Sequence, residues 1–241
     1  MKYLFEINNE MKELTLEELF VFVQNNKDCI VYKFIDNNKI LVNNDLILNC
    51  QFICHRINTI NELINIPNIF GIEVDLRDRN NNIILVHDPF KDGEDFNEFM
   101  KFFNHAFIIL NVKSAGIEDK CIEILNKYNI TNYFFLDSSI PITYEKGLMY
   151  NFASRFSTLE PIELSYSLDK YIKWLWIDCF NIKYPDDYYK YDFKKTCMVS
   201  PELQKKDINT DVIINYRNNF IKNKFIPNAI CCKIYNIIKW I

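Results

Sequence analysis

The sequence has no long apolar run and no excess of basic residues. No apolar stretch approaches the roughly 18 residues that a membrane-spanning helix requires. The start, MKYLFEINNEMKELTLEEL, carries acidic residues where a signal peptide needs an apolar stretch. The formal net charge of -4 provides no basic surface of the kind that follows a phosphate backbone. These absences indicate a soluble cytoplasmic protein with no transmembrane segment and no nucleic-acid partner.

Cysteine motifs for a metal are also missing. The eight cysteines form no CxxC pair and no Cys/His ligand spacing. Cys54 and Cys179 lie inside apolar runs, and Cys231 and Cys232 are adjacent. Such positions favour free, buried thiols in a reducing compartment over disulfides or a zinc site.

Short apolar runs rich in β-forming residues recur along the chain. The 241 residues, 49% of them hydrophobic, can bury one large core, so we expect one main domain. The runs cover residues 46–54, 71–76 with 83–86, 107–112, 132–136, 148–153, 174–177, 196–199 and 229–232. If the second pair forms one unit, the chain contains eight strand positions.

Segments with helical periodicity separate several of these runs. They cover residues 58–66, 95–103, 117–128 and 210–224. Strands that alternate with helices predict an α/β fold with a mostly parallel sheet, and eight such units predict a (β/α)8 TIM-type barrel. We assign residues 45–241 to this barrel and expect some irregular connections, above all after residues 174–177.

Residues 1–44 precede the series. Thr15 and Glu18 fit a capping box, and the apolar residues that follow predict a helix. We also expect a small hairpin from residues 30–34 and 39–42. No Pro, Gly or Ser linker follows, so this segment is predicted to be an N-terminal extension packed on the barrel.

Polar side chains follow two of the predicted strands. His55 and Arg56 come directly after residues 46–54, at the strand end where barrel enzymes carry their sites. His87 closes residues 83–86 in the same way. Between them, Glu73 and Asp75 lie two residues apart on a strand, so both side chains point to one face.

This arrangement suits phosphodiester chemistry. Two adjacent carboxylates repel each other unless a cation lies between them, and such hard oxygen ligands favour Mg²⁺ or Ca²⁺. A phosphodiester needs its charge neutralised, a base for the nucleophile and an acid for the leaving alcohol. One cation, two histidines and Arg56 supply all three.

Each feature also has a structural explanation. A single strand-end histidine is often structural, and an ExD pair is often a surface ladder. The third histidine, His105, has no such neighbours and is predicted to be a surface residue. Because the other two histidines flank the ExD pair, a functional site is the better interpretation.

The order of these motifs resembles a known family. HR, GIEVDLR, VHDP and ILNVKS follow one another as in the glycerophosphodiester phosphodiesterase superfamily, which also includes spider-type sphingomyelinase D enzymes. The later segments FFLDSS, ASRFSTLE, WIDCF and MVSPEL resemble a bacterial branch of it. The resemblance covers about residues 46–240 and is strongest through residue 116.

The resemblance implies roles for single residues. It makes Glu73 and Asp75 ligands of a divalent metal ion, and it makes His55 and His87 the acid–base pair. Arg56 and Lys113 are implied to contact the phosphate.

One position departs from the family pattern. The family carries a third acidic ligand where this chain has Asn111. Its amide oxygen can complete the metal site, but it brings no charge and should lower the affinity for metal. Asp137, Glu160 and Glu202 are candidates for the missing charge, with salt bridging or capping as the alternative. Trp176 is assigned to the substrate pocket and Tyr133 is a second candidate, with core packing as the alternative for both.

The sequence therefore predicts a phosphoric diester hydrolase of lipid metabolism. We expect cleavage of a small glycerophosphodiester-like substrate to an alcohol and a phosphomonoester, with a cyclic phosphate as one potential intermediate. The alternatives are a phosphatidylinositol-type phospholipase C and a non-catalytic phosphate-binding protein, the latter because of Asn111. The oligomeric state is not determined by the sequence.

Overall fold

The computed structural model describes residues 1–35, 38–191, 194–205 and 208–241. In this part of the chain, no helix is both long enough and apolar enough to cross a membrane. All eight cysteines lie within it, and they are free, as the sequence predicted.

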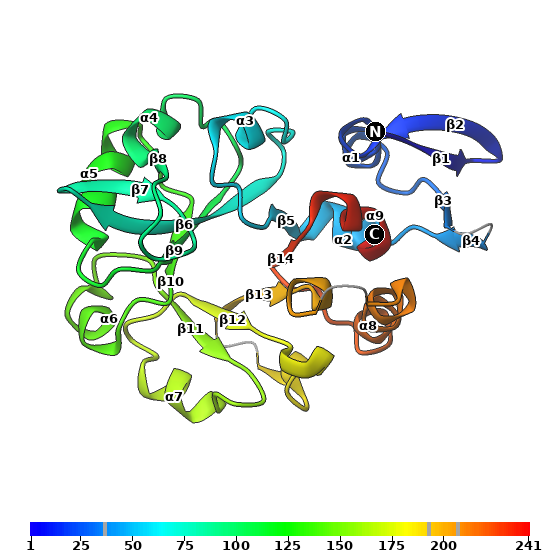
Figure 1. Cartoon of the computed structure of the whole chain (residues 1–241). Coiled ribbons are helices and arrows are strands. Elements are labelled where there is room, and N and C mark those ends of the chain that lie inside the picture. The colour runs from blue at the N-terminus through cyan, green and yellow to red at the C-terminus, as the bar shows by residue number, and fades with distance from the viewer. Residues whose placement is uncertain (36–37, 192–193, 206–207) are drawn as a thin grey trace.

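A sheet of parallel strands forms the centre of the molecule (Figure 1). Its members are β5 (Gln51–Cys54), β6 (Gly71–Arg79), β9 (Ile108–Val112), β10 (Tyr133–Leu136), β11 (Ala153–Phe156), β12 (Trp174–Ile177), β13 (Lys195–Val199) and β14 (Ala229–Cys232). They pair in the order β10-β9-β6-β5-β14-β13-β12-β11. An isolated parallel bridge joins Phe135 of β10 to Phe152, next to β11, so the two ends of this order touch. The predicted α/β fold with a mostly parallel sheet is confirmed.

Helices connect most of these strands and lie around them (Figure 1). They are α3 (Ile60–Leu63), α4 (Phe96–Met100), α5 (Glu118–Lys127), α6 (Ile140–Lys146), α7 (Ile162–Ser167), α8 (Thr210–Lys222) and α9 (Ile237–Trp240). The described residues between β12 and β13 contain two short 3-10 turns, η1 (Phe180–Ile182) and η2 (Tyr188–Lys190). Two further 3-10 turns, η3 (Pro201–Leu203) and η4 (Ile234–Asn236), follow β13 and β14. The predicted irregularity after residues 174–177 is confirmed.

Two predicted strand ranges were correct only at their carboxyl ends, where β5 covers Gln51–Cys54 and β11 begins at Ala153. Residues 46–49 belong to a helix, α2 (Asn44–Asn49), because the Asn43 side chain accepts from the amides of Asp45 and Leu46 and starts a helix there. The run 148–153 is mostly a turn after α6, in which the amides of Met149 and Tyr150 both donate to the Lys146 carbonyl. Hydrophobic content alone does not separate a buried strand from a capped helix or a turn.

Alternation along the parallel strands gives the sheet two apolar faces. One face carries Ile53, Ile109, Phe134, Leu136, Trp174, Trp176, Cys197, Val199, Ala229 and Cys231. The neighbouring residues in each strand, such as Cys54, Leu110 and Phe135, belong to the larger core beneath the helices. Since successive side chains of a strand point to opposite faces, the inner face also receives Glu73, Asp75 and Asn111.

The N-terminal segment forms a small sheet of its own beside the parallel sheet (Figure 1). It contains β1 (Lys2–Ile7), β2 (Glu10–Thr15), β3 (Val31–Ile35) and β4 (Asn38–Leu41) in the order β2-β1-β3-β4. The predicted hairpin corresponds to β3 and β4, and the predicted capping box at Thr15 starts α1 (Leu16–Asn25).

Helix α1 joins this segment to the rest of the core. The ring of Phe20 lies edge-on to Phe52 at 5.7 Å and to Phe70 at 5.3 Å. Such contacts explain why the segment packs on the main body, while a domain boundary at residue 44 stays a prediction.

Candidate active site

Three adjacent strands bring the predicted polar residues together. His55 and Arg56 follow β5, Glu73 and Asp75 lie on β6, and Asn111 lies on β9. Strand β6 pairs with both neighbours, and its Asp75 is in register with Asn111. We call these residues, together with Lys113, the Glu73–Asp75 cluster.

The Glu73 carboxylate is completely buried. Its Oε1 accepts from the Asn111 side-chain amide at 2.8 Å, and its Oε2 accepts from the Arg56 backbone amide at 2.8 Å. The His55 Nε2 lies 3.8 Å from Oε2. Glu73 therefore fixes the loop that carries both His55 and Arg56.

Asp75 is also completely buried but is less well satisfied. Its Oδ2 accepts from the Asn58 side-chain amide at 2.9 Å, and its backbone amide donates to Asn58 Oδ1 at 2.8 Å. Its Oδ1 has no hydrogen-bond partner in the described structure, although Lys113 Nζ lies 3.7 Å away. Burial and the Glu73 carboxylate raise the pKa of Asp75. Asp75 Oδ1 is therefore a buried carboxylate oxygen whose nearest cation lies beyond hydrogen-bond distance.

The backbone after β5 bends sharply at Arg56. Its φ of 55° lies in the left-handed region, which costs a residue with a side chain about 1–2 kcal/mol. This conformation directs the Arg56 amide to Glu73, and Arg56 Nε lies 3.8 Å from Asp75 Oδ2. Local strain of this kind is common at functional sites.

His55 is mostly buried and electrically neutral. Burial, together with the positive charges of Lys233 and Arg56, lowers the pKa of His55 to about 3. Its Nδ1 is buried, with no hydrogen-bond partner among the described residues. The imidazole therefore carries no second proton at neutral pH, and in this state of the protein its low pKa makes it a weak base.

His87 reaches the site by a different route from the one expected. It follows β7 (Asn82–Leu85), which is antiparallel to β6 and is not one of the parallel strands. Asn80 and Asn81 both have positive φ, as a tight hairpin turn requires. The returning chain then bonds back to β6, because the Val86 amide donates to the Asp75 carbonyl at 2.9 Å.

The His87 side chain is 41% exposed, and its Nδ1 lies 2.9 Å from Asp88 Oδ1. That hydrogen bond and the neighbouring Lys91 lower the pKa of Asp88 to about 2. An ionised Asp88 therefore orients the His87 ring through Nδ1, and the other ring nitrogen, Nε2, takes no part in this hydrogen bond. The Arg77 guanidinium bonds the His87 carbonyl and holds the hairpin end in place.

The donor set of the Glu73–Asp75 cluster suits a hard cation in part. Asp75 Oδ1 and Asn111 Oδ1 are buried oxygens without a hydrogen-bond partner in the described structure, next to a carboxylate pair. Such oxygens match the ligand preferences of Mg²⁺ and Ca²⁺. The described residues hold no group of three His, Cys, Asp or Glu side chains placed for a metal.

A second charged cluster lies at the ends of β10, β11 and β12. Arg155 bonds Asp137 at 2.5 Å, bonds Asp178, and lies 3.7 Å from Glu160. Although burial lowers the pKa of Arg155, the carboxylates of Asp137 and Asp178 raise it overall. We call these four residues the Arg155 cluster. Asp137 and Glu160 thus form salt bridges, the alternative that the sequence left open.

Glu202 also has local partners. It accepts from Ser200 and from the Lys233 backbone amide at 3.1 Å, so it caps the chain ends after β13 and β14. Lys113 connects the two clusters, because its Nζ lies 3.7 Å from Asp75 Oδ1 and 3.3 Å from Asp137 Oδ2.

Two aromatic residues lie within the core. Trp176 is buried on the inner face of the sheet, and its indole donates to Asp178 at 3.2 Å. Tyr133 is half-buried and packs edge-on against Phe135 in the larger core. Contact of Trp176 with a substrate stays a prediction.

His105 was wrongly predicted to be on the surface. It is 9% exposed, and its Nε2 donates to the Ile66 carbonyl at 2.9 Å. Burial lowers its pKa. The ring ties two loops together at the opposite ends of the strands from His55.

A cavity of about 530 Å³ adjoins His55 and Arg56. Its other charged lining residues are Lys205, Lys233, Lys239 and Glu202. The four cationic side chains outnumber the one carboxylate, so the cavity is electropositive although the whole chain is acidic. Lys233 also donates to the His55 carbonyl at 3.2 Å.

Sequence reasoning missed three residues of this region. The sequence places Asn58 at the start of a predicted helix and Asp178 in the WIDCF segment, and it assigns no role to Lys233. Asn58 and Asp178 follow strand ends closely, as His55 does, and that position was the available signal. Lys233 directly follows β14, the strand beside β5.

Comparisons with known proteins agree with this fold. No family model and no curated protein matches the sequence. Among solved structures, a glycerophosphoryl diester phosphodiesterase from Parabacteroides distasonis is similar with a TM-score of 0.57 and 12% identity, over 100% of this chain and 93% of that one. A glycerophosphodiester phosphodiesterase from Agrobacterium tumefaciens is similar with a TM-score of 0.53 and 9% identity, over 76% of this chain and 95% of that one. The resemblance noted in the sequence is thus confirmed at the level of the fold.

Proposed function

We propose that the protein is a metal-dependent phosphodiesterase on a (β/α)8 barrel, acting on a glycerophosphodiester-like substrate. The observation that carries the proposal is the buried pair Glu73 and Asp75. One of its oxygens has no hydrogen-bond partner in the described part of the chain, and the pair lies beside His55 and the hairpin that carries His87. The fold shared with two phosphodiesterases adds support.

Closure of the sheet into a barrel is part of this proposal. Eight parallel strands follow one another in a single order, and the bridge between Phe135 and Phe152 links its two ends. In such barrels the active site lies at the carboxyl ends of the strands. His55, Asp137 and Asp178 all directly follow such ends.

The proposed metal ligands are Glu73, Asp75 and Asn111. A bound Mg²⁺ or Ca²⁺ would supply positive charge opposite the non-bridging oxygens of the phosphate. Arg56 and Lys113, which already lie within 4 Å of Asp75, would hold the same phosphate from either side. With only two ionised ligands, we expect weaker metal binding than in a site with three.

His55 and His87 form the proposed acid–base pair. His55 has no second ring proton to donate at neutral pH, so we assign it the role of the base that removes the proton from an attacking hydroxyl, and the new P–O bond then forms as the bond to the leaving alcohol breaks. A substrate phosphate beside His55 would bring negative charge, which favours the protonated imidazole and raises its pKa. His87, oriented by Asp88, suits an acid that protonates the leaving oxygen. Each transfer of this kind typically contributes about 10²–10⁴-fold in rate.

A screen of phosphodiesters with the pure protein and Mg²⁺, Mn²⁺ or Ca²⁺ tests this function. We expect release of an alcohol that stops when EDTA removes the metal.

His55→Ala and His87→Ala should each lower turnover about 10²–10⁴-fold without loss of the fold. His105→Ala is the matched control, because that histidine lies outside the site and its loss should leave turnover unchanged. Near-normal turnover in a folded His55→Ala or His87→Ala variant contradicts the mechanism, and inositol phosphates as sole products favour a phospholipase C instead.

A non-catalytic phosphate-binding protein is the second candidate. It is favoured by Asn111 and by the cations Arg56 and Lys113, which lie close to Asp75 and partly offset its charge. This alternative predicts binding of inorganic phosphate or a diester without turnover at any metal concentration.

A further inference from the structure

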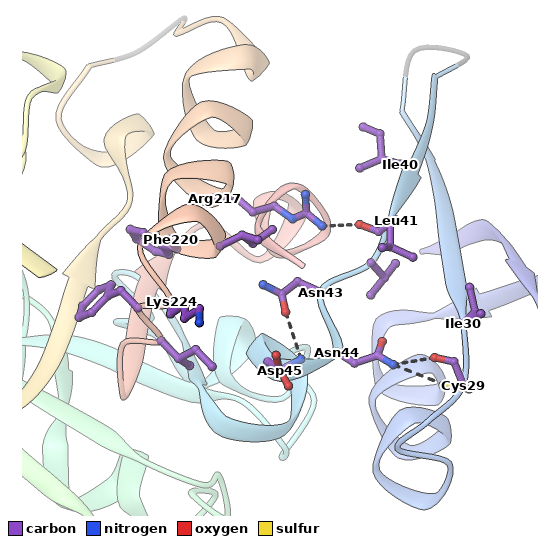
Figure 2. A pocket seen from close by; sticks show the side chains of 14 residues that line it. Cys29, Ile30, Ile40, Leu41, Asn43, Asn44, Asp45, Arg217, Phe220 and Lys224 are labelled. Carbon is purple, nitrogen blue, oxygen red and sulfur yellow. Dashed lines mark hydrogen bonds between the residues drawn. The ribbon is translucent and has the colours of Figure 1, made fainter.

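A separate cavity of about 680 Å³ lies between α8 and the N-terminal segment (Figure 2). Its lining comes from the end of β4, the start of α2, and α8 with the residues that follow it. Asn43 to Asp45 precede β5, and Phe225 and Ile226 precede β14. The cavity therefore lies near the amino ends of these strands, whereas His55 follows their carboxyl ends.

A buried cation that has no acidic partner among the described residues faces this cavity. Arg217 of α8 is 4% exposed, donates to the Leu41 carbonyl, and donates to Asn218 Oδ1 at 3.3 Å. Its Nε has no hydrogen-bond partner, and no carboxylate among the described residues forms an ion pair with it. Figure 2 shows its guanidinium reaching from α8 toward Leu41.

Such a charge is costly to bury alone. Burial lowers the pKa of Arg217 to about 10, so the group stays protonated at neutral pH. Burial and the charge of Arg217 also lower the pKa of the nearby Lys33, whose Nζ is occupied by backbone carbonyls of the α9 region. Lys33 is held by the backbone oxygens of Ile238, Lys239 and Ile241 and does not line the cavity, so the charge that an anion in the cavity would offset is that of Arg217.

The rest of the cavity is largely apolar. Four of its hydrophobic residues are unusually exposed: Ile30 at 56%, Leu41 at 54%, Ile221 at 49% and Ile226 at 38%. Lys224 adds a second positive charge, and Asp45 adds one negative charge. A cavity of this size and character matches those that bind small organic ligands.

We propose that this cavity binds a small amphipathic anion, with its carboxylate or phosphate head group on Arg217 and its apolar chain on the exposed isoleucines and Leu41. The negative head group of such a ligand would pair with the buried positive charge of the cavity, and its apolar chain would cover the exposed apolar wall. The site is independent of His55 and of the proposed catalysis.

Calorimetric titration of the full chain with decanoate and with decyl phosphate, below their micelle-forming concentrations, tests the proposal. We expect saturable binding of one anion per chain, and the tighter of the two identifies the head group. Decanol, which lacks the charge, and inorganic phosphate, which lacks the chain, should each bind at least about tenfold more weakly. Absence of saturable binding, or equal affinity for decanol and the two anions, overturns the proposal.

Variants locate the site. Arg217→Met should weaken anion binding by about 10- to 100-fold and abolish the preference over decanol. Ile221→Ser should weaken it by about tenfold, whereas Ile64→Ser, at an apolar residue that is 63% exposed outside the cavity, should have no effect. If Arg217→Met does not fold, Ile221→Ser and Lys224→Met decide the question. Unchanged binding in the folded Arg217→Met variant, or in both of the other two, contradicts the assignment.

Discussion

The Glu73–Asp75 cluster and the Arg155 cluster lie at the carboxyl ends of the same parallel sheet, yet their charges are balanced differently. In the Arg155 cluster one guanidinium contacts three carboxylates, and Asp178, the most buried of them, also accepts from Trp176. In the Glu73–Asp75 cluster both carboxylates are fully buried, and Asp75 Oδ1 lacks a hydrogen-bond donor in the described structure. The cations nearest to Asp75 are Lys113 at 3.7 Å and Arg56 at 3.8 Å.

The contrast distinguishes a structural cluster from a candidate site. A buried ion pair with complete partners is satisfied by the protein itself, whereas a buried carboxylate pair with a raised pKa on one member and an oxygen without a hydrogen-bond donor in the described structure is typical of a functional site. Sequence composition does not reveal this difference, because both clusters are carboxylates and cations at strand ends.

The largest expected effect follows from removing the centre of the Arg155 cluster. Arg155→Met leaves the buried Asp178 without its cation and should lower the free energy of unfolding by about 3–5 kcal/mol. Urea denaturation measures this loss. Arg79→Met, which breaks an exposed pair with Asp92, is the control and should cost less than about 1 kcal/mol. Equal effects of the two variants would show that the Arg155 cluster is not a structural unit.

A third carboxylate should strengthen the proposed metal site. Asn111→Asp adds the missing charge and should tighten binding of Mg²⁺ or Ca²⁺ by about tenfold. Calorimetric titration of the metal measures the change. Asn151→Asp, at a half-buried asparagine before β11, controls for added charge elsewhere in the molecule. Unchanged or weaker metal binding in Asn111→Asp contradicts the assignment of Asn111 as a ligand.

Neutralising one of the two carboxylates should stabilise the metal-free protein. Since burial and Glu73 raise the pKa of Asp75 above its unfolded value, its ionised form opposes folding at neutral pH. Asp75→Asn should therefore raise the free energy of unfolding in EDTA by up to about 1 kcal/mol at neutral pH. The gain should shrink as the pH falls and the native Asp75 becomes protonated. A loss of stability at neutral pH would mean that Arg56 and Lys113 already balance the pair.

The smallest expected effect concerns the residue between the clusters. Lys113→Met removes a cation that lies close to Asp75 Oδ1, so metal binding should tighten by about two- to fivefold. Lys146→Met serves as the control for loss of a lysine, because Lys146 forms its ion pair with Asp119 and not with a member of either cluster. Weaker metal binding in Lys113→Met would show that this lysine supports the site instead of competing with the ion.

Several elements could be predicted because their signals are local. The capping box at Thr15 and the strand at Trp174–Ile177 depend only on neighbouring residues, and both are as expected. The strand expected over residues 46–54 was too long, because an Asn43 cap starts a helix in the same apolar run. His105 was misplaced, since its burial depends on a carbonyl 39 positions away in the sequence.

In the candidate site, too, features with local signals could be predicted and features that depend on long-range contacts could not. The period of two along β6 was sufficient to place Glu73 and Asp75 on one face, and the parallel order placed His55 at the same end. The return of His87 required the antiparallel β7 hairpin, which a simple count of strand ends did not include. The partners Asn58 and Lys233 were missed because their contacts join different elements.

By itself, the sequence determined the alternation of strands and helices, the carboxylate pair and the histidines that flank it, because each of these depends on spacing along the chain. The tertiary structure decided which charges are satisfied. Asp137 and Glu160 form ion pairs with Arg155, whereas among the described residues Arg217 has no acidic partner and Asp75 Oδ1 has no hydrogen-bond donor. Partners of a buried charge come from strands and loops that meet only in the folded chain, and burial then makes each missing partner energetically important.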